Sequence, residues 1–166
     1  MRIISCILLI LPALGFSQPN KSFEIGDTLP DFSYQGAFQK PYHLNELKGS
    51  FALVHFWASW NAESRTLQRE MAAPYMKYKD KKFKTGRKFY IISISLDETR
   101  KYCDLALKKD NLPWKSLVCD EKGWNSPIVE NCGVKTIPSN FLLNPYGIIV
   151  AKNINATDLE RLLRAY

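Results

Sequence analysis

Apolar residues gather in short continuous runs along the chain, separated by segments with helical spacing. The segments 51–57, FALVHFW, and 88–96, KFYIISISL, are mostly apolar and contain little alternation. Runs of this length are typical of strands that are covered on both faces. A further strand is predicted over 114–119. The pattern therefore predicts several central strands of a buried sheet.

Helices are predicted in the segments that connect these strands. Apolar residues recur at spacings of three and four from Ala62 to about Lys82, which predicts an amphipathic helix with a kink at Pro74. A second helix is expected over 97–111, with Asp97 as its cap. Strands and helices thus alternate along the middle of the chain.

The last part of the chain predicts a short helix, a hairpin and a final helix. Pro127 suits the first turn of the short helix, and the segments 139–144 and 147–153 flank an Asn-Pro-Tyr-Gly turn. Thr157 is expected to cap the final helix. Before the body, residues 18–50 are punctuated by Gly, Pro and Asp and predict a strand or hairpin extension.

This order of elements predicts an α/β fold. A mixed central sheet would be flanked by helices on both faces, with the extension at its amino-terminal end. It is the order of a thioredoxin-like fold.

The amino-terminal residues have a different character. Arg2 precedes an apolar run from Ile3 to Phe16 that ends in small residues. This is typical of a secretory signal peptide, and the run is shorter than the roughly 20 residues that a membrane-spanning helix needs. We expect residues 1–17 to be removed and a single domain, 18–166, to be exported to the periplasm or cell envelope, with no stable membrane span.

The chain is basic, with a formal net charge of +7, and much of this charge lies in the run KYKDKKFKTGRK, 77–88. The run lacks the interleaved aromatic residues of a base-stacking surface. It is interpreted as a solvated helix end with its following loop, so no nucleic-acid partner is predicted.

Signal cleavage would remove Cys6 and leave Cys103, Cys119 and Cys132. A disulfide between Cys119 and Cys132 would close a small loop and stabilise the fold by about 3 kcal/mol. Alternatively, all three cysteines are small buried hydrophobic residues.

Three segments in order, IGDTLPDFSY, LNELKGSFALVHFWASW and VKTIPSNFLLNPYGIIV, resemble exported thioredoxin-like proteins of the TlpA and ResA type, within the redoxin superfamily. The resemblance covers most of residues 24–165. The resemblance implies a family of thiol-disulfide oxidoreductases. In that family, a Cys-x-x-Cys motif follows the Trp-Ala-Ser-Trp segment. Here Asn61 and Ser64 occupy the two cysteine positions.

The exchange chemistry requires sulfur. A helix amino terminus lowers the pKa of the first thiol, its thiolate attacks a disulfide, and the second thiol resolves the mixed disulfide. Neither Asn61 nor Ser64 can do this, so no catalytic residue is predicted. His43 and His55 are interpreted as structural rather than as bases for Ser64. No metal-ligand spacing is present, and no cofactor is predicted.

In the segment Thr136-Ile137-Pro138, the proline matches the cis proline that faces the redox motif in this family. The resemblance implies that the preceding residue offers its backbone to an extended peptide. Trp57, Trp60, Ile137 and Pro138 are therefore predicted to border a peptide groove. The alternative is that these residues only pack the fold.

Three functions follow as hypotheses. The first is a redox-degenerate protein of the cell envelope that binds a peptide or protein partner. The alternative is a thiol-disulfide oxidoreductase that uses the remaining cysteines, Cys103, Cys119 and Cys132. A structural or assembly role, with the basic helix end as contact surface, is the third.

Overall fold

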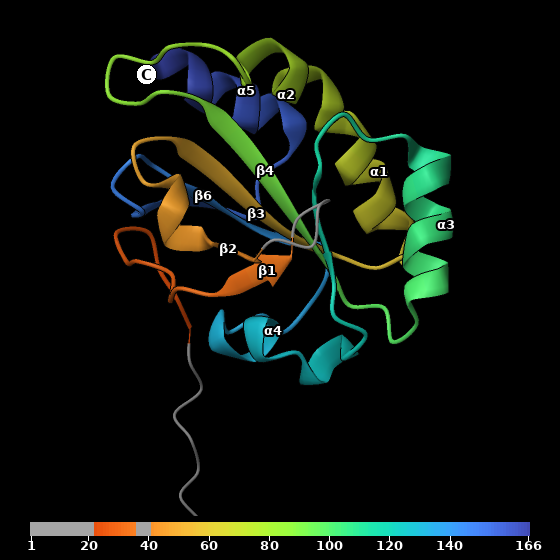
Figure 1. Cartoon of the computed structure of the whole chain (residues 1–166). Coiled ribbons are helices and arrows are strands. Elements are labelled where there is room, and N and C mark those ends of the chain that lie inside the picture. Colours follow the sequence, from red (N-terminus) through yellow and green to blue (C-terminus); the bar gives the residue numbers. More distant parts are fainter. Residues whose placement is uncertain (1–21, 36–40) are drawn as a thin grey trace, which may run out of the picture.

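A computed structural model describes residues 22–35 and 41–166, so the expected signal peptide lies outside the described residues. A five-stranded sheet with the order β5-β4-β3-β6-β7 forms its centre (Figure 1). The central strands β3, β4 and β5 run parallel, β6 is antiparallel to β3, and β7 is antiparallel to β6. The predicted mixed sheet is thus confirmed. The strands are β3 (Phe51–Trp57), β4 (Phe89–Ser95), β5 (Ser116–Cys119), β6 (Ser139–Leu143) and β7 (Ile149–Lys152).

A separate two-stranded hairpin precedes this sheet. It pairs β1 (Ser33–Gln35) with β2 (Pro41–His43) in antiparallel register and leads into a short 3-10 helix, η1 (Leu44–Leu47). The predicted amino-terminal extension is therefore confirmed as a hairpin. No helix in the part of the chain that the structure describes is long and apolar enough to cross a membrane.

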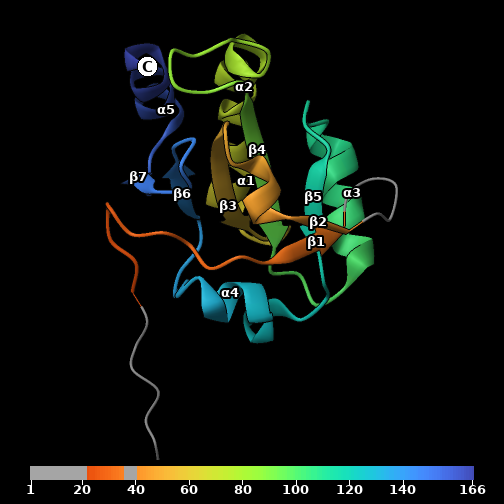
Figure 2. The same cartoon turned by 60° about the vertical axis from the view of Figure 1, so that its left-hand side comes forward.

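Within residues 22–35 and 41–166, five α-helices flank the sheet. They are α1 (Ala62–Glu70), α2 (Ala72–Tyr78), α3 (Arg100–Asp110), α4 (Pro127–Asn131) and α5 (Ala156–Ala165), and η2 (Gly123–Asn125) precedes α4. In Figure 2, α4 and the β1–β2 hairpin lie apart from α2 and α5.

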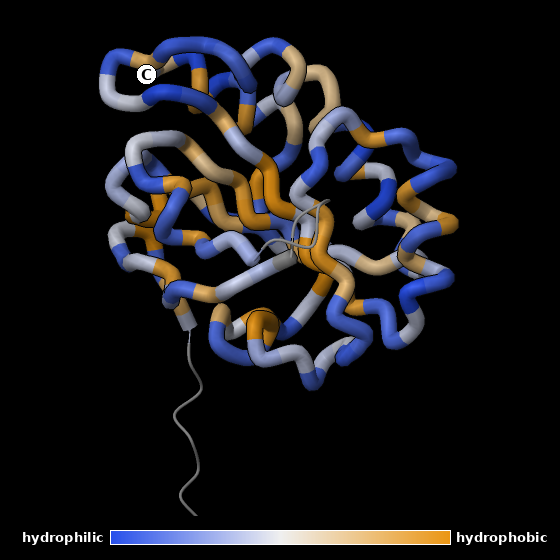
Figure 3. Tube along the Cα trace, viewed as in Figure 1, coloured by the Kyte–Doolittle hydropathy of each residue, from blue (hydrophilic) through white to orange (hydrophobic). Residues whose placement is uncertain are grey.

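Alternation along β3 divides the core into two layers. Phe51 and Leu53 pack into a cluster with residues of α5 and the α1–α2 junction. Ala52 and Val54 pack into a cluster with residues of α4 and the hairpin. Apolar colour follows the central strands in Figure 3, as expected for a sheet that is buried on both faces.

The helix predicted from Ala62 to about Lys82 is divided and shorter. It breaks at Met71 between α1 and α2, and α2 ends at Tyr78. Pro74 explains the break, because a proline ring clashes with the carbonyl four residues earlier, that of Glu70, where α1 ends.

Two predicted helix caps are wrong. Helix α3 begins at Arg100 after Thr99, and Asp97 instead accepts hydrogen bonds from its neighbours. Helix α5 is capped by Asn155, whose Oδ1 accepts from the Asp158 amide at 2.8 Å, rather than by Thr157.

Two other boundaries can be compared with the prediction. The third central strand begins at Ser116 rather than at Trp114. Pro127 does begin α4, as its fixed backbone angle suggested.

Candidate functional site

The carboxyl end of β3 leads through a short loop into α1. Asn61 is the N-cap of α1, and its Oδ1 accepts a hydrogen bond from the Ser64 amide at 2.7 Å. Asparagine is among the strongest N-cap residues because this bond satisfies an amide that the helix leaves unpaired. Asn61, which the resemblance aligns with the first cysteine of the dithiol, is therefore a helix cap.

The second position is closed to solvent. Ser64 is fully buried, and its Oγ has no hydrogen-bond partner among the described residues. His55 of β3 lies near the Ser64 backbone, and Gln68 follows one turn later on α1; both side chains are also buried. A hydroxyl enclosed in this way cannot reach a substrate, so Ser64 offers no nucleophile.

His55 is held neutral in this enclosure. Burial lowers the pKa of His55 to about 4, although the nearby backbone of Ser139 and Ser64 partly offsets the effect. Neither ring nitrogen makes a hydrogen bond of good geometry within the described chain. The sequence-based interpretation of His55 as structural is consistent with this position.

A buried carboxylate anchors the loop between β3 and α1. Asp97 is 2% exposed and follows β4. It accepts hydrogen bonds from the Ser59 hydroxyl at 2.6 Å, from the Ser59 amide at 3.0 Å and from the Ser95 hydroxyl at 2.6 Å. The Trp-Ala-Ser-Trp loop is thereby tied to the end of β4. Sequence reasoning missed this role because an aspartate before a helical pattern also suits a cap.

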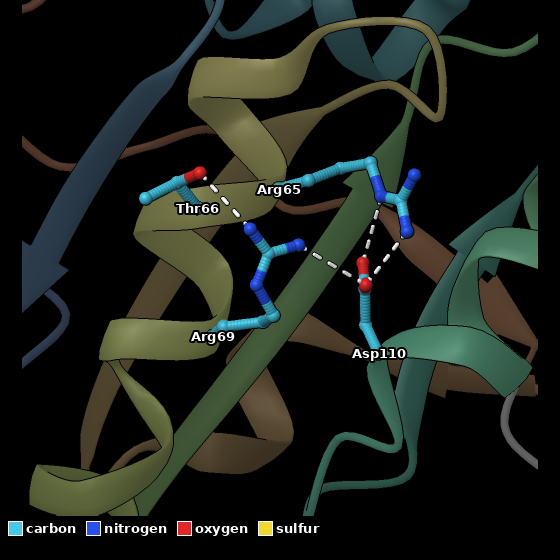
Figure 4. Close-up of polar contacts among 4 residues, drawn as sticks. All are labelled: Arg65, Thr66, Arg69 and Asp110. Atoms are coloured by element: carbon cyan, nitrogen blue, oxygen red, sulfur yellow. Dashed lines mark hydrogen bonds and ion pairs between the residues drawn. The ribbon is translucent and has the colours of Figure 1, made fainter.

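A second carboxylate ties α1 to α3 (Figure 4). Asp110 accepts from Arg65 at 2.7 and 2.9 Å and from Arg69 at 3.1 Å. Burial would raise the pKa of Asp110, but the hydrogen bonds from both arginines outweigh it and leave the pKa below its usual value. The start of α1 is thus fixed from two sides.

An open cleft lies along α1. The Ile137–Pro138 peptide bond is cis, and Pro138 lines a cleft of about 560 Å³ together with α1 and residues 153–155. Two acidic residues of α1, Glu63 and Glu70, also line it, and no lysine, arginine or cysteine is among its described lining residues. The backbone of Ile137 takes part in no hydrogen bond between described residues.

The four predicted groove residues occupy different environments. Pro138 lines the cleft, Trp60 is 61% exposed, and Ile137 is half-buried against the α4 side of the core. Trp57 is only 1% exposed and packs with residues of α3 and β5. The prediction that Trp57 borders a groove is wrong, because its side chain points into the core.

The described cysteines are all buried and form no disulfide. Cys119 packs with Cys103 and Trp57, whereas Cys132 belongs to the core layer on the α4 side. The predicted bridge between Cys119 and Cys132 is thus not formed in the structure. Within the described residues, no group of three His, Cys, Asp or Glu side chains could hold a metal ion.

Comparison with known proteins agrees with this geometry. Residues 49–149 match the model of a thioredoxin-like family. The chain belongs to this thioredoxin-like family. Curated relatives include the thiol-disulfide oxidoreductase ResA of Bacillus anthracis, which is 29% identical over 89% of this chain and 80% of its own length.

Solved thioredoxin-like structures are also similar. A thiol-disulfide oxidoreductase from Bacteroides fragilis is 30% identical, with a TM-score of 0.72 over 84% of this chain and 98% of that one. The thioredoxin domain of a thiol-disulfide oxidoreductase from Bacteroides vulgatus has a TM-score of 0.74 at 24% identity over 87% of this chain and 98% of that one. The predicted resemblance to thiol-disulfide oxidoreductases of the ResA and TlpA type is thus confirmed for this chain.

Proposed function

We propose that this chain is an exported thioredoxin-like protein that binds an extended, positively charged peptide segment without exchanging disulfides at α1. The observation that carries the proposal is the acidic cleft between α1 and Pro138, which is open and lined by no sulfur among the described residues. Export is supported by the signal-peptide pattern of residues 1–17.

The loss of exchange chemistry at α1 follows from the two side chains present. The Asn61 amide is engaged as a helix cap, and the Ser64 hydroxyl is buried. A thiolate is the attacking group in disulfide exchange, and neither side chain can supply one.

Peptide binding requires backbone groups and a matching surface. The Ile137 backbone, which no described residue engages, can pair with an extended peptide as an added strand. Glu63 and Glu70 on the opposite wall favour a lysine or arginine side chain in that peptide. The exposed indole of Trp60 lies just before α1 and offers apolar contact area.

Fluorescence anisotropy tests the proposal directly. The probes are two labelled, cysteine-free peptides of equal length, one containing lysine and one containing glutamate at the same positions. We expect saturable binding of the lysine peptide only. Glu70→Lys should weaken it about fivefold, corresponding to about 1 kcal/mol for reversing one exposed charge.

Glu46→Lys is the matched control, because Glu46 is also exposed but does not line the cleft. It changes the net charge equally and should leave the affinity within twofold or so. Equal weakening by both variants would mean that only long-range charge matters. Binding of neither peptide would contradict the proposal.

A further inference from the structure

Two cysteines that the proposed function does not use are in contact. Cys103 lies in the first turn of α3, and Cys119 is the last residue of β5. Both side chains pack in one buried cluster with Trp57, and each perturbs the pKa of the other. A disulfide needs Cα atoms within about 7 Å, so only cysteines packed together in this way can be bridged without moving the backbone.

The pair lies at the same sheet edge as the start of α1. Trp57 pairs with Ser95, and Ser95 pairs with Cys119, so the carboxyl ends of three parallel strands are in register. The Ser95 hydroxyl, which donates to Asp97, also contacts Cys103. The cysteine pair is thus connected to the loop that carries the altered family motif.

Small molecules can approach the pair from one side. Cys103 and Cys119 both line a cavity of about 1110 Å³ between α3, β5, α4 and the β1 segment. Cys119 is 7% exposed and Cys103 is 1% exposed. Arg100 also lines this cavity, and its Nη2 donates to the Cys119 carbonyl at 2.9 Å.

We propose that Cys103 and Cys119 form a redox dithiol, which a low-molecular-weight disulfide entering this cavity converts into an intramolecular disulfide between α3 and β5. This dithiol does not depend on the peptide cleft, whose described lining includes neither cysteine.

Thiol-disulfide exchange balances the reaction. The Cys119 thiolate attacks one sulfur of the small disulfide, forms a mixed disulfide and releases one thiol. Cys103 then loses its proton to the departing group and attacks the Cys119 sulfur, which releases the second thiol. Two protein S–H bonds become one S–S bond, and the small disulfide is reduced to two thiols.

Electrostatics favours this order of attack. The hydrogen bond from Cys103 and the nearby Arg100 charge lower the pKa of Cys119, against the effect of burial. The same contact and burial raise the pKa of Cys103. The first thiolate therefore belongs to Cys119, which is also the more exposed of the two.

Peptide mapping can identify the bond. Trypsin places Cys103, Cys119 and Cys132 on three separate peptides, 102–108, 116–122 and 123–135. The reduced, folded protein is incubated with oxidised glutathione, quenched in acid, alkylated, digested and analysed by mass spectrometry without reduction. We expect the peptides 102–108 and 116–122 to be linked, and a glutathione redox titration to show one two-electron transition.

Three serine variants sharpen the test. Cys103→Ser should accumulate glutathione on Cys119, whereas Cys119→Ser should leave Cys103 unmodified. Cys132→Ser is the matched control and should retain the link. Circular dichroism shows whether each variant is folded, and the wild-type map does not depend on any variant.

Other maps would overturn the proposal. A link between 116–122 and 123–135 would support the sequence-based pairing instead. Full alkylation of Cys103 and Cys119 in folded, glutathione-treated wild type would show that no dithiol reacts. Glutathione on Cys103 in the Cys119→Ser variant would refute the order of attack.

Discussion

The start of α1 and the cysteine pair lie on one edge of the sheet but have opposite properties. The start of α1 has a helix cap, an anchored loop and Pro138 in the adjoining cleft, but it carries no sulfur. The pair of Cys103 and Cys119 has two sulfurs, but neither begins a helix. The comparison teaches that a fold can preserve a reactive geometry independently of the reactive atoms.

Exposure makes the contrast sharper. Asn61 is partly exposed and Ser64 is fully buried, which suits an attacking position followed by a resolving one. Cys119 and Cys103 are both buried in the wall of a cavity. Protein substrates can therefore approach α1, while only small reagents can approach the cysteine pair.

Restoring sulfur at α1 should produce the largest effect. We predict that Asn61→Cys with Ser64→Cys gives disulfide-reductase turnover on insulin, where the wild type stays at background. The helix amino terminus would lower the pKa of the new first thiol, and Pro138 already lines the cleft beside α1. Insulin precipitation with dithiothreitol measures the rate.

A control must exclude activity that comes from the native cysteines of this double variant. Adding Cys103→Ser and Cys119→Ser should leave the new activity in place, because insulin cannot enter the cavity. A folded double-cysteine variant without activity would show that two thiols at these positions are not enough to make α1 active. Activity that disappears with the serine changes would place it in the cysteine pair.

Acid should lower the free energy of unfolding because His55 is buried in its neutral form beside α1. His55 is neutral in the folded chain because its pKa is about 4, whereas in the unfolded chain it binds a proton below its ordinary 6.5. Its contribution to stability is complete above pH 6.5 and is lost as the pH falls towards 4. The loss should reach about 3 kcal/mol.

Urea unfolding across this pH range measures the effect. His55→Asn should have a shallower dependence of the free energy of unfolding on pH than the wild type. His43→Asn is the comparison variant, because His43 lies at the exposed surface. Parallel curves for wild type and His55→Asn would contradict the neutral, buried state of His55.

The smallest effect concerns the Asn61 cap. Asn61→Ala should lower the free energy of unfolding by about 1 kcal/mol, since the Ser64 amide loses its acceptor. Asn155→Ala removes the equivalent bond in α5 and should have a similar cost. A much smaller loss at Asn61 than at Asn155 would mean that the cap is not what Asn61 contributes.

Much of the fold could be predicted from the sequence because its determinants are local and repeated. Continuous apolar runs gave β3 and β4, and helical spacing gave α1. The predictions of the two helix caps were wrong because Asp97 and Thr157 are residue types that suit several local roles. Only the distant Ser59 decides that Asp97 anchors a loop.

The candidate site was less accessible to sequence reasoning. Trp57 was placed at the groove because of the family resemblance, whereas its side chain is buried against residues of α3 and β5. The sequence positions of Cys103 and Cys119 could have predicted their contact, but the sequence analysis did not use them. One cysteine follows β4, the other ends β5, and neighbouring parallel strands end at one edge.

The Asn61 cap has a consequence for ligands with negative groups. Free amides at a helix start commonly attract phosphate, sulfate or carboxylate. In α1 the Ser64 amide already donates to a side chain, and Glu63 adds a negative charge in the first turn. We therefore expect anionic metabolites not to bind at the start of α1. Cations and neutral chain segments can bind there instead.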